Sequence, residues 1–227
     1  MAKYNRIQAA MTMNETGIVP VFYHPDVKVC VQVLKACYDG GLRVFEYTNR
    51  GESAHEGFAE VVKYAAEKLP GMIMGAGSVV DPATAALYIQ NGAGFIVSPI
   101  LNEDMARICN RRKILWIPGC GSVSEISKSE ELGAEVVKIF PAREVGGPSF
   151  VKNIRGPMPW VQIMPTGGVE PVYENLFQWF SAGVWCVGMG SKLFPKEIIE
   201  KADYNAIKVK VEETLAIVKA IRQELQK

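Results

Sequence analysis

This 227-residue chain contains eight short apolar runs, and the stretches between them are long enough to form helices. This alternation constrains the fold more than any other feature. The runs are nearly continuous in hydrophobicity and rich in β-branched residues, as parallel strands buried on both faces must be. Parallel neighbours need crossover connections, and the helical stretches between the runs supply them. The predicted strands are 18–23, 44–47, 72–75, 95–97, 115–117, 136–140, 162–164 and 184–188.

The ends of the predicted helices support this division. Asp81-Pro82 places a capping acceptor before a first-turn proline, and Asn91-Gly92 ends the same helix. A helix-ending glycine followed by a short link and a strand occurs four times, at 39–44, 91–96, 132–137 and 182–187. The spacing of roughly 40 to 50 residues corresponds to about two βα units and is typical of an internally repetitive barrel.

Eight strands that alternate with helices predict an α/β fold, a single (β/α)8 TIM barrel that occupies residues 1–227 as one domain. A doubly wound open sheet is the alternative. The stretch that ends at Thr16 and the segment from Tyr204 to Lys227 are predicted to form extra N-terminal and C-terminal helices.

The amino-acid composition indicates which kinds of binding partner the chain does not attract by its charge. The chain is 48% hydrophobic and 22% charged with a net charge of +1, so bulk electrostatics favours neither nucleic acid nor a membrane surface. No apolar run approaches the length of a membrane span and no signal-peptide pattern opens the chain, which predicts a cytoplasmic protein. Five scattered cysteines and two isolated histidines predict reduced thiols and no metal site or other cofactor.

One lysine breaks the apolar pattern. Lys138 stands in the run VVKIFP at 136–141, which is too hydrophobic for a surface strand. Burial favours the uncharged form of an amine, and such an amine condenses with ketones and aldehydes to form a Schiff base. A structural lysine neutralised by a buried carboxylate is the alternative, and this segment alone does not separate the two.

Strand alternation relates this lysine to a glutamate. Lys138 and Phe140 share one face of their strand, and Glu46 and Thr48 share one face of theirs. If both faces point inward, the barrel holds an amine and a proton-shuttling carboxyl group in one dry cavity. Arg50 then supplies a fork suited to a substrate carboxylate. The alternatives are a structural ion pair for Glu46 and an exposed loop charge for Arg50.

Two late glycine-rich turns favour a phosphate site. Thr166-Gly167-Gly168 and Gly190-Ser191 follow the last two predicted strands, where backbone N–H groups can approach a phosphate. The hydroxyl groups of Thr166 and Ser191 would add donors. Ordinary turns explain most glycine pairs, and Lys192 is either an added attraction or a solvated surface charge.

Together these segments resemble the 2-keto-3-deoxy-6-phosphogluconate (KDPG) aldolases, including members that also cleave 4-hydroxy-2-oxoglutarate (KHG). The resemblance runs from about Val19 to Pro195. Its blocks are EYTNR at 46–50, GAGSV at 75–79, IPG at 117–119, KIFPA at 138–142 and PTGGV at 165–169.

The resemblance implies a class I, metal-independent pyruvate aldolase, usually a homotrimer of (β/α)8 barrels. Lys138 would form the Schiff base and Glu46 would be the general acid and base. Arg50 and Ser78, where the family usually has threonine, would hold the substrate carboxylate, with Pro99 and Phe140 packed around the pyruvyl half. The distal phosphate would be received by Thr166, Gly167, Gly168, Gly190 and Ser191.

The chain departs from the family pattern near the predicted mouth. Tyr23-His24 replaces an arginine that many relatives carry, and Ile100 follows Pro99 where glycine is common. Met189 and Lys192 differ from the commoner Gly-Gly-Ser-Trp ending. These departures leave the Lys138–Glu46 pair intact and put the identity of the distal substrate group in doubt.

The expected activity is therefore cleavage of a small 2-keto-4-hydroxy acid: KDPG to pyruvate and glyceraldehyde 3-phosphate, with KHG to pyruvate and glyoxylate as a further reaction. Three alternatives stay open. They are a 2-keto-3-deoxy-6-phosphogalactonate aldolase, another phosphate-binding barrel enzyme and a non-catalytic sugar-acid binding protein. The second would leave the Lys–Glu–Arg set unexplained.

Overall fold

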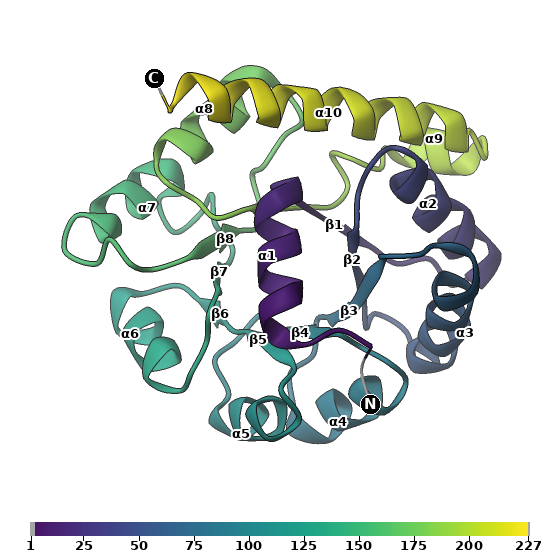
Figure 1. The fold of residues 1–227 in the computed structure, drawn as a ribbon, viewed down its shortest axis with the longest axis horizontal. Coiled ribbons are helices and arrows are strands. Elements are labelled where there is room, and N and C mark those ends of the chain that lie inside the picture. The colour runs from purple at the N-terminus through teal and green to yellow at the C-terminus, as the bar shows by residue number, and fades with distance from the viewer. Residues whose placement is uncertain (1–2, 227) are drawn as a thin grey trace.

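A computed structural model describes residues 3–226, in which parallel strands alternate with α-helices (Figure 1). The strands are β1 Ile18–Phe22, β2 Val44–Thr48, β3 Ile73–Gly77, β4 Phe95–Val97, β5 Leu115–Ile117, β6 Gly119–Cys120, β7 Val137–Ile139, β8 Ile163–Pro165 and β9 Val187–Met189. The helices are α1 Arg6–Thr16, α2 Val27–Asp39, α3 Ala54–Lys68, α4 Pro82–Gln90, α5 Glu103–Arg112, α6 Val123–Glu131, α7 Gly147–Arg155, α8 Tyr173–Ser181, α9 Lys196–Glu200 and α10 Tyr204–Glu224.

The strands form two parallel sheets. Six strands pair in the order β5-β4-β3-β2-β1-β9, and three pair in the order β6-β7-β8. Pro118 separates β5 from β6, and a bridge between Thr166 and Gly188 connects the end of β8 with β9. The predicted α/β fold with parallel strands is thus confirmed.

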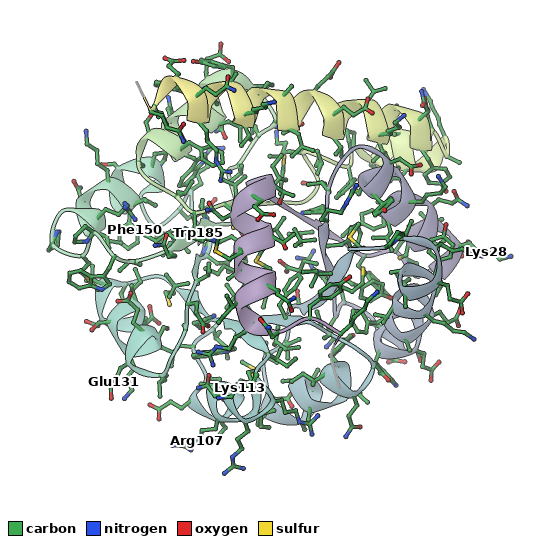
Figure 2. The ribbon with its side chains drawn as sticks, viewed as in Figure 1. Lys28, Arg107, Lys113, Glu131, Phe150 and Trp185 are labelled. Atoms are coloured by element: carbon green, nitrogen blue, oxygen red, sulfur yellow. The ribbon has the colours of Figure 1, made fainter. Side chains whose placement is uncertain are left out.

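Most predicted strands agree with the observed ones to within two residues, and the two larger differences lie at β6 and β9. The short strand β6 occupies residues expected to be a loop, because the backbone resumes pairing after Pro118, which has no N–H to donate. Strand β9 begins at Val187 instead of residue 184. Trp185 lies just ahead of it, beside α1 (Figure 2), and its indole Nε1 donates to the carbonyl of Ala10 at 3.0 Å.

The apolar core has two layers. One cluster fills the space between the strands and the surrounding helices, whereas charged side chains such as Lys28, Arg107 and Glu131 point outward (Figure 2). The second cluster joins strand residues such as Val44, Phe95 and Met164 to Ala9 and Met13 of α1. Helix α1 therefore closes the space enclosed by the strands at one end (Figure 1), which leaves the carboxyl ends of the strands for a site.

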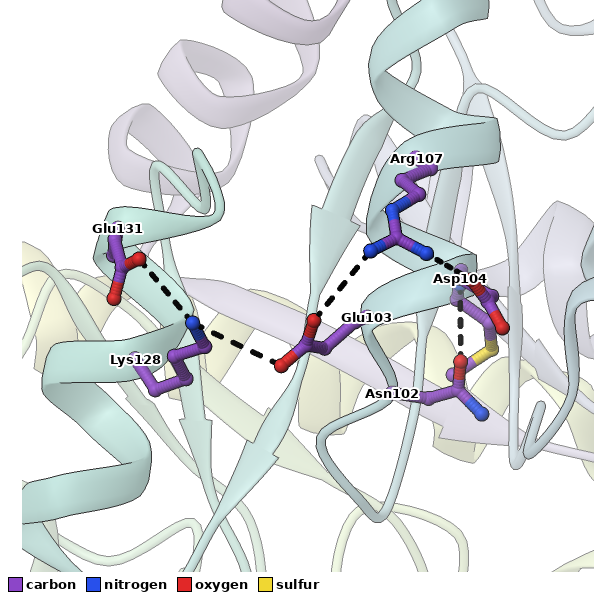
Figure 3. Close-up of polar contacts among 7 residues, drawn as sticks. Asn102, Glu103, Asp104, Arg107, Lys128 and Glu131 are labelled. Carbon is purple, nitrogen blue, oxygen red and sulfur yellow. Dashed lines mark hydrogen bonds and ion pairs between the residues drawn. The ribbon is translucent and has the colours of Figure 1, made fainter.

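Charged side chains connect neighbouring helices at the surface. Lys128 of α6 lies 3.8 Å from Glu103 of α5, and Arg107 pairs with Glu103 and Asp104 (Figure 3). Asn102 caps α5 by accepting from the N–H of Met105 at 3.1 Å. These side chains are largely exposed, so each ion pair adds little stability. Within residues 3–226, no helix combines the length and apolarity needed to cross a bilayer.

Arg222 connects α10 with the N-terminal half of the molecule. Its guanidinium donates to the carbonyl of Trp185 at 3.0 Å and to the carbonyl of Asn14, and it lies 5.1 Å from the centre of the Phe180 ring. These contacts join the last helix to the end of α1 and to the residues that enter β9.

Replacement of Arg222 with methionine keeps the apolar stem but leaves these carbonyls without a donor. We expect Arg222→Met to lower the free energy of unfolding by about 2 kcal/mol, as the loss of hydrogen bonds from a charged group does. Urea denaturation measures the change. Lys219→Met, at an exposed position of the same helix, is the control and should stay within about 0.5 kcal/mol of the parent. Equal midpoints for the two variants would contradict the assignment.

Candidate active site

The structure brings Lys138 of β7 and Glu46 of β2 together. The Lys138 Nζ lies 3.9 Å from the Glu46 Oε1 and 5.0 Å from the centre of the Phe140 ring. Glu46 is fully buried and Lys138 is only 5% exposed. The backbone N–H of Lys138 donates to the carbonyl of Pro118 at 2.8 Å, which fixes the register that turns its amine toward Glu46. An amine and a carboxyl group therefore face one another in a water-poor space.

The environment of Glu46 suits proton exchange. Both carboxyl oxygens are buried, and neither has a hydrogen-bond partner among the described residues. Burial raises the pKa of Glu46 above the ordinary glutamate value of 4.5, although the charges of Lys138 and Arg50 oppose the shift. The group therefore keeps its proton to higher pH than an exposed carboxyl does, which suits a group that gives and takes protons.

Gly77 makes room for this carboxyl group. It is paired with Thr48 in the β2–β3 ladder, and a Cβ added to it would lie 1.9 Å from the Glu46 Oε1. A side chain at position 77 is thus incompatible with the position of Glu46. Sequence reasoning placed Gly77 at the end of a strand and missed this role, because a contact across two strands leaves no local signal.

A pocket of about 490 Å³ lies next to the pair, although Lys138 and Glu46 themselves are not part of its lining. Thr48 and Phe140 line it, each two residues beyond a member of the pair and on the same strand face. Of the predicted site residues, those in the lining are Arg50, Phe140, Thr166, Gly167, Gly168, Gly190 and Ser191. Ser78 and Pro99 are half-buried beyond β3 and β4 and lie outside the lining.

One side of the pocket is rich in free hydrogen-bond donors. Gly167 and Gly168 adopt φ values of +100° and +76°, which glycine allows without strain. Within residues 3–226, the N–H groups of Gly167, Gly168, Gly190 and Ser191 donate to no protein acceptor, and the buried Thr166 Oγ1 has no partner. Convergent, unpaired donors of this kind form an anion-binding concavity.

Asn175 of α8 fixes the shape of this turn. Its Oδ1 accepts from the N–H of Glu170 at 2.8 Å, and its Nδ2 donates to the carbonyl of Gly168 at 3.2 Å. Sequence reasoning missed Asn175, since a helix-surface asparagine carries no sign of such a contact.

Two hydrogen bonds of Asn49 hold the loop that carries Arg50. The Tyr88 hydroxyl donates to the Asn49 Oδ1 at 2.9 Å, and the Asn49 N–H donates to the carbonyl of Gly77 at 2.8 Å. Tyr23 lines the pocket, and its hydroxyl lies where a Cβ on Gly51 would be, so a larger residue at position 51 would displace the Tyr23 side chain. Arg50 itself is exposed to the pocket.

The four departures from the family pattern occupy different places. Tyr23 and Lys192 line the pocket, whereas Ile100 is exposed beyond β4 and outside the lining. Met189 is buried in the outer core, so the expectation that it lies near the mouth is wrong. In residues 3–226, no three His, Cys, Asp or Glu side chains gather as metal ligands would, and all five cysteines are free and buried.

The α/β fold, the buried Lys–Glu pair and the turn of unpaired donors are the features expected of an aldolase that acts through an imine. The model of the KDPG and KHG aldolase family matches residues 9–210, and the chain belongs to this family. The family expected from the sequence is thus confirmed.

Curated relatives and solved structures agree with this assignment. A 2-dehydro-3-deoxy-phosphogluconate aldolase of Pseudoalteromonas atlantica is 35% identical over 91% of this chain and 94% of its own length. The KHG/KDPG aldolase of Escherichia coli is 35% identical over 88% of this chain and 91% of its own. A KDPG aldolase of Legionella pneumophila, solved with pyruvate captured as a covalent carbinolamine, superposes with a TM-score of 0.82 at 27% identity, covering 90% of this chain and 97% of its own.

Substitution of Gly77 tests the packing beneath the pair. In Gly77→Ala the new methyl group displaces the Glu46 carboxyl from a packed interior, which we expect to cost about 1–3 kcal/mol of unfolding free energy. Chemical denaturation measures it. Gly156→Ala is the matched control, because its Cβ meets nothing closer than 3.5 Å and its φ is −57°. A Gly77→Ala protein as stable as this control would show that Glu46 does not occupy the space.

The raised pKa of Glu46 predicts how stability varies with pH. The native protein holds this proton more tightly than the unfolded chain, so the carboxyl group reduces stability increasingly as pH rises from its unfolded pKa through its native pKa. Glu46→Gln removes the titration, so its stability relative to the parent should rise between about pH 4 and about pH 8. Urea midpoints at both pH values measure this difference. A difference that is constant with pH would contradict the raised pKa.

Proposed function

We propose that this protein is a class I, metal-independent aldolase that cleaves KDPG to pyruvate and glyceraldehyde 3-phosphate through a Schiff base on Lys138. The observation that carries the proposal is the buried amine 3.9 Å from a buried carboxyl group. Thr48 and Phe140, two residues beyond the members of this pair, line a pocket that also holds a turn of unpaired donors. Membership of the family and the names of the relatives support the same reaction.

The first half of the reaction joins substrate and enzyme. The amine of Lys138 attacks the C2 ketone and forms a carbinolamine. Glu46 supplies the proton with which the hydroxyl group leaves as water, and an iminium ion results. The carbinolamine captured in the Legionella pneumophila relative is the corresponding species in that protein. Each assisted proton transfer contributes roughly 10²- to 10⁴-fold in rate.

The second half breaks the carbon–carbon bond. The Glu46 carboxylate, directly or through a water, takes the proton of the C4 hydroxyl, the C3–C4 bond breaks, and its electron pair moves into the iminium to give an enamine. The C4 fragment leaves as an aldehyde. The enamine is then protonated at C3, and water hydrolyses the resulting imine to pyruvate and the free lysine.

The remaining site residues divide between the two ends of the substrate. Arg50 and Ser78 hold the carboxylate, and Pro99 and Phe140 pack around the pyruvyl half. The proposed roles of Ser78 and Pro99 require the substrate to reach beyond the lining of the open pocket. The phosphate is received by Thr166, Gly167, Gly168, Gly190 and Ser191, whose unpaired donors support this role.

Cleavage of KHG is proposed as a further activity. It rests on the family as a whole and on the Escherichia coli relative, whose name includes KHG. KHG carries the same 2-keto-4-hydroxy acid unit, so the Lys138–Glu46 chemistry is unchanged and only the occupant of the distal turn differs.

We also propose that the two sheets close into one (β/α)8 barrel that forms a single domain over residues 1–227. In support, only Pro118 separates β5 from β6, so both occupy one position, and the Thr166–Gly188 bridge joins the sheets on the other side. A homotrimer in the cytoplasm is the proposed state. Exposed apolar side chains at Val80, Ile100 and Val123 provide contact surface, and buried free thiols suit a reducing compartment.

Borohydride trapping tests the proposed chemistry. Reduction in the presence of pyruvate should attach a pyruvyl group to Lys138, identified by peptide mass spectrometry. Lys138→Ala should lose both the adduct and turnover of KDPG. Glu46→Gln should still bind substrate while kcat falls by roughly 10²-fold or more, because proton relay is lost.

Lys128→Ala is the control, since that lysine lies on the surface of α6 and should keep both adduct and turnover. An adduct on another lysine, or pyruvate release that survives Lys138→Ala, would refute the mechanism. A panel of KDPG, its galactonate epimer and KHG then ranks the substrates by kcat/KM.

A further inference from the structure

We infer that Lys192 is a specificity-determining cation of the distal subsite that favours a doubly charged distal group, and that Glu170 competes with this group for the lysine. This inference rests on the proposed function. It addresses a residue that stands where the family more commonly has tryptophan.

Lys192 lies beside the free donors of the anion-binding turn. It follows Ser191 directly and lines the same pocket as Gly167 and Gly168. Its Nζ is 3.0 Å from the Glu170 Oε1, and the two side chains are 60% and 38% exposed. The ammonium group therefore lies at the rim of the pocket, close to the donors and partly exposed to solvent.

The charges of the pocket favour a ligand that is anionic at both ends. Among the described residues its lining holds two cationic side chains, Arg50 and Lys192, and no carboxylate. Arg50 follows β2 and Lys192 follows β9, with β1 between these strands in the sheet. The two cations therefore stand apart, one on the side proposed for the 2-keto carboxylate and the other beside the anion-binding turn.

Glu170 competes with the distal group of the substrate for Lys192. An exposed pair contributes little to stability, so an incoming dianion can replace the carboxylate at small cost. A phosphate then gains a charge-assisted contact with Lys192 in addition to the backbone donors. A neutral hydroxyl group cannot compete with Glu170, and a single carboxylate gains less than a dianion does.

Glu170 is placed for this competition by the backbone. Asn175 accepts from the N–H of Glu170 and donates to the carbonyl of Gly168, so one side chain joins the backbone of Glu170 to the glycine turn. The residue that bears the competing carboxylate is thus kept next to the subsite.

Three variants test the inference with KDPG and its unphosphorylated analogue, 2-keto-3-deoxygluconate. In Lys192→Gln the ratio of kcat/KM for KDPG to kcat/KM for the analogue should fall roughly tenfold or more, as the loss of one charge-assisted contact predicts. The fall should come from a higher KM for KDPG. In Glu170→Gln the same ratio should rise. Inorganic phosphate should inhibit the parent and should inhibit Lys192→Gln several-fold more weakly.

Lys196→Gln is the matched control, because this lysine pairs with Glu200 outside the pocket. Its ratio should equal that of the parent. Equal ratios for Lys192→Gln and Lys196→Gln, or a ratio that falls in Glu170→Gln, would overturn the inference. Pyruvate trapping in the parent protein keeps the two proposals distinguishable: no adduct on Lys138 refutes the proposed function, whereas an adduct with unchanged ratios refutes only the role of Lys192.

Discussion

A lysine and a glutamate that share one water-poor space impose the main requirement on this molecule. Transfer of both side chains from water is unfavourable, and their attraction offsets it only if the geometry is maintained. The structure maintains it with backbone elements: Lys138 and Glu46 come from the interiors of two strands, and the carbonyl of Pro118 sets the register of Lys138. Gly77 leaves the volume that the carboxyl group occupies.

The two ends of the strands serve different purposes. At one end α1 packs its small and apolar side chains against the inner strand residues, which excludes water from beneath the pair. At the other end the loops carry polar groups that remain unpaired within the described residues, including the Thr166 hydroxyl and the neighbouring glycine N–H groups. Stability and the proposed chemistry are thereby separated along the strand axis, as is usual for parallel α/β enzymes.

Much of this arrangement was predictable because it follows from local patterns. Continuous apolar runs predicted the parallel strands, and a lysine inside such a run predicted a buried amine. Alternation along each strand indicated that Thr48 and Phe140 lie on the same faces as the pair. Gly77 and Asn175 were not predictable in this way. Their roles depend on which atoms other strands and helices bring near them, and no spacing along the chain encodes that.

Elsewhere the sequence pattern misled for identifiable reasons. The run from 184 suggested a strand, but the backbone begins pairing only at Val187, after Trp185 has turned its indole toward α1. Met189 was expected near the mouth because its neighbours are, yet strand alternation places it in the outer core. Within a strand, the immediate neighbour of a site residue points to the opposite face.

The contact between Pro118 and Lys138 has a consequence for how this chain can change during evolution. Pro118 interrupts one ladder, while its carbonyl sets the alignment of the next strand. An insertion or deletion of one residue between 115 and 120 would shift the pairing of this segment with β7 by one position, and the carbonyl of Pro118 would no longer meet the N–H of Lys138. Length in this short segment should be far less variable than in the surface connections, however freely its individual side chains are exchanged.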